Sequence, residues 1–178
     1  MTEEWLEKLA SQIKDRERKG AEEASRARFK IQLLGQRGPL FWKSFSDALQ
    51  EHVLTLKNLL EGDVTLVEGP LSFAFDATTL QITLAKSAFP TVRFDATPRF
   101  DRGMAEITYL SAGQRSEPTA MSCQLEINND ARVTMRLDGR TFTHPAQAAT
   151  FVMERLFHIS SPQRIHSHDS HLGRVGSE

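Results

Sequence analysis

The spacing of apolar residues changes from a helical period to an alternating one near Gly62, and this change constrains the fold most. Before Gly62, apolar residues recur every three or four positions, which is typical of an amphipathic helix. After it, apolar and polar residues alternate, which is typical of strands with one face toward a core. We therefore predict an α+β protein in which helices cover the apolar face of a mainly antiparallel sheet.

Two helices are predicted before the change. The first runs from residue 3 to about residue 34 and carries a thin apolar stripe that is interrupted near Gly20. The segment from Gly35 to Pro39 is expected to end it, because glycine and proline disfavour helix interiors. The second helix runs from about residue 40 to residue 61 and is expected to stop at Gly62. Its strong core stripe contains Trp42, Phe45, Leu49, Val53, Leu56 and Leu60.

The alternating segments between residues 64 and 142 predict about six or seven strands. They cover residues 71–75, 80–84, 92–95, 105–109, 123–127 and 132–137. Short turns favour a meander, because parallel crossovers require a dozen or more residues. Asn128-Asn129-Asp130 in particular predicts a hairpin between the last two of these strands. A C-terminal helix is predicted from Pro145 to about His158, with Thr143 or His144 as its cap.

These elements divide the chain into a helical arm (1–38), an α+β core domain (39–159) and a polar tail (160–178) that is expected to be disordered. The tail holds His166, His168, Asp169 and His171, which could bind a transition metal ion. A metal site usually sits on a rigid element with supporting hydrogen bonds, and the tail offers neither. We therefore predict no metal site and interpret the tail as solvated.

The composition argues against several classes of partner. The 22 basic and 23 acidic residues give a formal net charge of −1, so no overall field attracts nucleic acid or anionic lipid. No apolar run approaches the roughly 18 residues that would span a bilayer, and the first residues lack the pattern of a secretory signal. We expect a cytoplasmic protein with neither a nucleic-acid nor a membrane partner.

The sequence contains no Gly-rich phosphate loop, nucleophile elbow, zincin helix or dinucleotide fingerprint. Cys123 is the only cysteine, and it lies on the inward-facing register of its strand, where a buried thiol is expected. His52 and His144 are expected to be structural. We predict no catalytic residue and no cofactor, and we lean against an enzyme.

Two groups of residues are candidate sites. Trp42 and Phe45 on the second helix could line an apolar ligand pocket with Phe73 and Phe75 on the sheet; the favoured alternative is that these rings simply fill the core. Charged residues on the polar face of the sheet could form a docking surface or an acid/base pocket, although a wet face with cross-strand ion pairs is the favoured alternative. The members of this second group are Arg93, Glu106, Glu126 and Arg136.

The sequence does not determine the function. The favoured interpretation is a non-enzymatic interaction or assembly module that binds a protein partner or itself, forming a homodimer through the first helix. The alternative is a small-ligand-binding α+β cup with a pocket between helix and sheet. A third hypothesis, a hydrolase or isomerase, needs two of Asp95, Glu106 and Glu126 close together in a recess.

Overall fold

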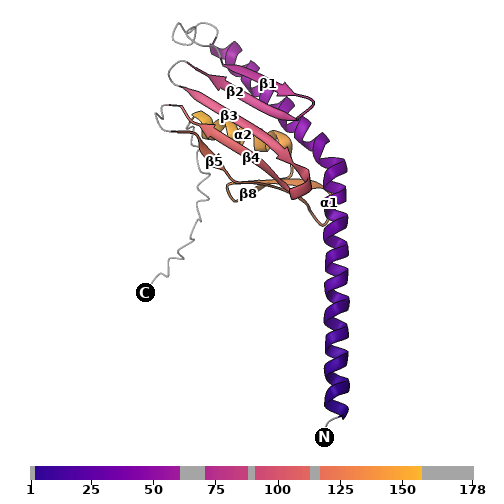
Figure 1. Cartoon of the computed structure of the whole chain (residues 1–178). Coiled ribbons are helices and arrows are strands. Elements are labelled where there is room, and N and C mark those ends of the chain that lie inside the picture. The colour runs from indigo at the N-terminus through magenta and orange to yellow at the C-terminus, as the bar shows by residue number, and fades with distance from the viewer. Residues whose placement is uncertain (1–2, 61–70, 88–90, 113–116, 158–178) are drawn as a thin grey trace, which may run out of the picture.

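A computed structural model describes residues 3–60, 71–87, 91–112 and 117–157 of the chain (Figure 1). A long helix, α1, comes first, strands follow, and a shorter helix, α2, closes the described part. The bounds are α1 Glu3–Leu60, β1 Ser72–Asp76, β2 Gln81–Lys86, β3 Val92–Arg99, the 3-10 helix η2 Phe100–Arg102, β4 Met104–Leu110, β5 Thr119–Met121, β6 Cys123–Ile127, β7 Val133–Leu137, β8 Arg140–Phe142 and α2 Pro145–Phe157.

The strands form one antiparallel meander. Their order is β1-β2-β3-β4-β6-β7-β8, and β5 pairs with β4 beside β6. The predicted hairpin is confirmed: β6 pairs with β7, and the Asn128 side chain accepts hydrogen bonds from the backbone N–H groups of Asp130 and Arg132 at 3.0 and 2.9 Å. The prediction of six or seven strands missed β5 and β8, which have three residues each, because so short a run shows no alternation.

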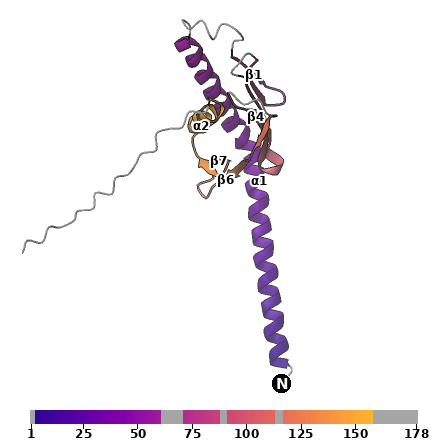
Figure 2. The same cartoon turned by 90° about the vertical axis from the view of Figure 1, so that its left-hand side faces the viewer.

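Both helices lie on the same face of the sheet (Figures 1 and 2). The second half of α1 packs on α2, and both helices contact strands of the sheet. The strands contribute their inward-facing side chains to the core, among them Ile82, Leu84, Phe94, Ile107, Leu125, Met135 and Leu137. This confirms the α+β prediction, with one apolar sheet face covered by helices.

The predicted break between two N-terminal helices is wrong, because α1 continues through residues 35–39 with Pro39 inside it. Figure 1 shows α1 changing direction where it reaches the sheet, and sharp bends of this kind are usually caused by proline. A proline inside a helix costs about 3 kcal/mol. Burying side chains as large as Trp42 and Phe45 is worth about 1.5–3 kcal/mol each, so packing of the second half on the sheet outweighs that cost.

Gly38 has a packing role instead of a helix-ending one. It is buried, and a Cβ atom at this position would lie 2.5 Å from the Phe100 ring, on η2. At Gly35 a Cβ atom would meet nothing within 4 Å. The backbone of α1 therefore lies directly on the corner of the sheet at Gly38, and glycine permits that contact.

The first half of α1 projects beyond the sheet (Figures 1 and 2). Every side chain from residue 4 to residue 32 is exposed, and burial along α1 begins with Leu33 and Leu34. We call residues 4–32 the arm. At 1.5 Å per residue the arm is roughly 40 Å long.

Several predictions from the sequence lie outside the described residues. They are the stop at Gly62, the turn at Gly69-Pro70 and the tail at 160–178 with its histidines. Among the helices of the described part, none combines the length and the apolar character needed to cross a bilayer.

The contact between Gly38 and Phe100 predicts opposite effects for two glycine substitutions in one helix. Gly38→Ala should lower the free energy of unfolding by about 1–3 kcal/mol, because the added methyl group clashes with the ring. Gly35→Ala, the matched control, should leave it unchanged or raise it by up to about 1 kcal/mol, through helix propensity alone. Urea unfolding followed by circular dichroism checks both. Equal effects would show that Gly38 does not make a close contact.

Candidate functional site

The aromatic residues predicted to line a ligand pocket belong to the core. Trp42 and Phe45 are fully buried, and their ring centroids lie 5.3 Å apart in a tilted arrangement. The Trp42 indole N–H donates a hydrogen bond to the Leu80 carbonyl oxygen at 2.7 Å, which ties α1 to the turn before β2. Phe73 and Phe75 are half-buried and pack against the same core. None of the four lines either hollow described below, so the ligand cup stays a prediction.

The charged residues predicted on the polar sheet face, Arg93, Glu106, Glu126 and Arg136, are all exposed, and three of them make local contacts. Arg93 pairs with Asp95 at 2.6 Å, Glu106 pairs with Arg99 at 3.3 Å, and the Arg136 guanidinium donates to the Gln124 amide oxygen at 3.5 Å.

The acids of the third hypothesis are not gathered in one recess. Asp95 forms an ion pair with Arg93, while Glu106 and Glu126 line two different hollows. The described residues contain no cluster of three or more His, Cys, Asp or Glu side chains that could hold a metal ion. The ion pairs of the polar face, Arg93 with Asp95 and Arg99 with Glu106, are therefore separate and exposed, and such pairs contribute little to stability individually.

The burial predicted for Cys123 is confirmed, and His52 and His144 both make local hydrogen bonds. Cys123 is buried, and burial raises the pKa of its thiol to about 12. The His52 ring lies 3.1 Å from the Thr150 hydroxyl and joins α1 to α2. The His144 carbonyl accepts hydrogen bonds from the backbone N–H groups of Gln147 and Ala148 at the start of α2.

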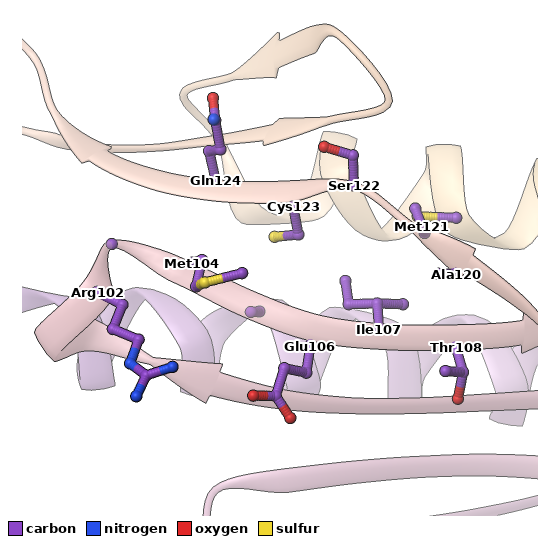
Figure 3. A pocket seen from close by; sticks show the side chains of 12 residues that line it. Arg102, Met104, Glu106, Ile107, Thr108, Ala120, Met121, Ser122, Cys123 and Gln124 are labelled. Carbon is purple, nitrogen blue, oxygen red and sulfur yellow. The ribbon is translucent and has the colours of Figure 1, made fainter.

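One hollow lies between β4 and the β5–β6 segment and has a volume of about 450 Å³. Figure 3 shows the side chains of Ser122 and Gln124 pointing away from those of Glu106 and Thr108, which lie on the opposite strand. A small-molecule site needs a few polar groups that converge on the ligand. These polar groups point in different directions, so this hollow lacks the arrangement of a small-molecule binding site.

A second hollow, of about 300 Å³, lies where the arm meets the sheet. We call it the arm-base hollow. It is lined by Ala27, Lys30, Ile31 and Leu34 of α1, by Asp101, Arg102 and Gly103 at the η2 corner, and by Leu125, Glu126 and Ile127 of β6. The leucine and isoleucine side chains make it apolar, and charged side chains of both signs complete the lining.

Sequence reasoning missed the arm-base hollow. Its sheet side depends on Gly103, which has a positive φ of 63° and follows η2 directly. Asp101-Arg102-Gly103 is a recognisable turn signal between two alternating segments. That signal predicts a turn, but the approach of this turn to Leu34 on α1 is a long-range contact that spacing does not reveal.

The arm carries exposed apolar side chains that continue the buried stripe of α1. Leu6, Leu9 and Ile13 stand 36 residues before Trp42, Phe45 and Leu49 respectively, and 36 residues make ten helical turns. The outer residues therefore share the helix face that packs on the sheet further along. With Trp5, they are between 37% and 63% exposed.

Phe29 provides a contrast on the same arm. It is 59% exposed, and at 100° per residue it lies on the face opposite to Leu9. Exposure of one large side chain is ordinary at a protein surface. An apolar stripe that is aligned with a core stripe and left uncovered is a candidate interaction surface.

Searches with the sequence against protein-family models and curated proteins, and with the structure against solved structures, gave no match. The candidate surface therefore stands on its geometry alone.

The buried thiol predicts slow chemistry at Cys123. Desolvation disfavours the thiolate, and with a pKa of about 12 the folded protein holds a neutral thiol at pH 8. Ellman's reagent should react with the folded chain at least about a hundredfold more slowly than with the chain in guanidinium, where the thiol titrates near its usual pKa of about 8.5. The raised pKa also means that this residue's contribution to stability is lost as pH rises from about 8.5 toward 12. Equal rates in both states would place Cys123 at the surface.

Proposed function

We propose that this protein is a non-enzymatic assembly module that forms a homodimer through its arm. The observation that carries the proposal is the uncovered apolar stripe on residues 4–32. It belongs to the same helix face that buries Trp42, Phe45 and Leu49 on the sheet. The part of this face that has no sheet to pack on takes a second copy of the chain as its partner.

Packing of the stripe against a partner also accounts for the helical conformation of the arm. Most helical stability in proteins comes from packing of an apolar face rather than from propensity. The arm has little local support beyond pairs such as Arg18 with Asp15, whose nitrogen and oxygen lie 3.3 Å apart. Covering the stripe supplies the packing that the sheet supplies to the second half of α1.

Hydrophobic burial supplies a free energy of the same size as the cost of association. Each arm offers five exposed large side chains on the stripe, namely Trp5, Leu6, Leu9, Ile13 and Ile31. Each is about half exposed, so covering it gains roughly 1 kcal/mol, and two arms together gain about 10 kcal/mol. This is comparable with the association cost of about 4–15 kcal/mol. The formal net charge of −1 gives little repulsion between two copies.

The chemistry of the described residues supports a role without catalysis. Asp95 and Glu106, two acids on the polar face of the sheet, are paired with arginines. The Cys123 thiol is buried and neutral. An acid/base or nucleophilic site requires an accessible group with a suitably shifted pKa.

The proposal predicts that two polar substitutions on the stripe dissociate the dimer. Sedimentation velocity of the full chain at tens of micromolar should give a dimer. Leu9→Ser with Ile13→Ser should weaken the dimer at least about a hundredfold, through the loss of four apolar side chains from the interface. The matched control Phe29→Ser, on the opposite face of the same arm, should leave the dimer intact.

A monomeric full chain at these concentrations would refute the proposal. Equal weakening by the stripe variant and by the Phe29 variant would show that the arm does not associate through its stripe. Circular dichroism should show that the second half of α1 and the sheet remain folded in every variant.

A further inference from the structure

The stripe of the arm is symmetric about Gly20. Its positions at three- and four-residue spacing are Leu6, Leu9, Ile13, Arg16, Gly20, Ala24, Ala27 and Ile31, and the series ends at Leu34, which lies just beyond the arm and is buried. Reversing the direction of the helix about Gly20 places Leu9 opposite Ile31 and Ile13 opposite Ala27. Every apolar position then meets an apolar or small residue, and the one charged position, Arg16, meets Ala24, which leaves room for the arginine stem.

Gly20 stands where two arms related in this way would cross. A Cβ atom there would meet nothing within 4 Å in the single chain, and glycine in an exposed helix costs about 1 kcal/mol relative to alanine. Close approach of a second backbone at this point gives the glycine a structural role.

The charges of the arm separate its two ends. Residues 3–7 contain Glu3, Glu4 and Glu7 and are followed by Lys8, and residues 26–30 contain Arg26, Arg28 and Lys30 without an acid. Parallel arms would place like charges side by side at both ends. Antiparallel arms in this register place Glu7 of one arm one helical turn from Lys30 of the other, within the Debye length of about 10 Å.

The arm-base hollow lies where the first turns of an antiparallel partner would end. Ala27, Ile31 and Leu34 of the stripe form its arm side. Its volume of about 300 Å³ equals the space of roughly ten water molecules, which suits large apolar side chains. Lys30 and Arg102 in its lining complement the acidic first turns and can also lie against an indole ring.

We infer that the two arms pair antiparallel about Gly20, and that Trp5 and Leu6 of each arm occupy the arm-base hollow of the other subunit. This inference rests on the self-association proposed above and adds its direction, its register and its end point. We call the first turns of the arm, with Trp5 and Leu6, its tip. Each subunit inserts its tip into the hollow of the other subunit and receives the other tip in return.

Disulfide trapping in the full chain tests direction and register. Leu9→Cys and Ile31→Cys are made in separate chains, mixed and mildly oxidised, while Cys123 stays unreactive because it is buried. The mixed Leu9–Ile31 disulfide should dominate over either homodisulfide by at least about tenfold. In the antiparallel pair, two copies of Leu9 are 22 residues, or about 33 Å, apart along the helices, far beyond the Cα separation of about 7 Å that a disulfide permits.

Phe29→Cys, mixed with Leu9→Cys, is the matched control, because it lies at a similar level of the arm but on the opposite face. It should give no mixed disulfide. Homodisulfides in place of the mixed product would overturn the antiparallel arrangement while leaving self-association intact. A monomeric chain in sedimentation would overturn both proposals at once.

Reversal of charge tests the electrostatic step separately. Changing Glu7 to lysine should weaken the dimer about threefold or more at low salt, and adding Lys30→Glu should restore it. A parallel pair would show no loss in the first variant, since like charges already face each other there.

Quenching of Trp5 by acrylamide tests the end point. Trp42 is fully buried and Trp5 is 63% exposed in the single chain, so a change in quenching on association reports Trp5. The quenching constant should fall at least about threefold between the monomeric Leu9→Ser, Ile13→Ser variant and the wild-type dimer. Equal constants in a chain that is dimeric would show that the arm-base hollow does not receive the tip.

Discussion

The structure depends on one apolar face of α1 that is longer than the surface available to cover it. From Leu34 to Val53 this face packs on the sheet and α2, and Trp42, Phe45 and Leu49 lie in the centre of the core. Across residues 4–32 the same face continues without cover. Hydrophobic burial is not directional, so the force that places the second half of α1 on the sheet also favours any cover for the first half. Fold and proposed function therefore follow from a single pattern in one helix.

The junction between the two halves of α1 determines where the arm points. Gly38 lies against Phe100, Leu34 is buried beside the η2 corner, and the Arg37 guanidinium donates a hydrogen bond to the Ala131 carbonyl in the β6–β7 connection. These contacts hold the arm to a corner of the sheet from two sides. A free helix would swivel about the bend near Pro39, whereas this one leaves the sheet in a fixed direction and keeps the arm-base hollow beside its stripe (Figure 1).

The sequence predicted the parts of the fold that depend on local pattern. Alternation placed β1 to β4, β6 and β7 correctly, and Asn128 marked the hairpin whose backbone its side chain holds. The break at Gly35–Pro39 was predicted wrongly because local propensity, worth about 1–3 kcal/mol, was weighed without the burial that opposes it. The arm was predicted from its stripe, but the arm-base hollow was not, since it arises from the meeting of Leu34 with Gly103, nearly seventy residues apart. Contacts of that kind leave no periodic trace.

The proposed antiparallel pairing of arms would limit assembly to two subunits. A two-fold interface is isologous, so each subunit offers the same tip and the same hollow to the other. Once both tips are seated, both hollows are filled and no uncovered stripe remains to recruit a third chain. A parallel pair would cover the stripe but leave two apolar hollows open at the arm bases, next to Leu125 and Ile127, and exposed apolar recesses of this kind promote further association. The position of the hollow at the end of the stripe, rather than elsewhere on the sheet, would therefore link the proposed closed dimer to this fold.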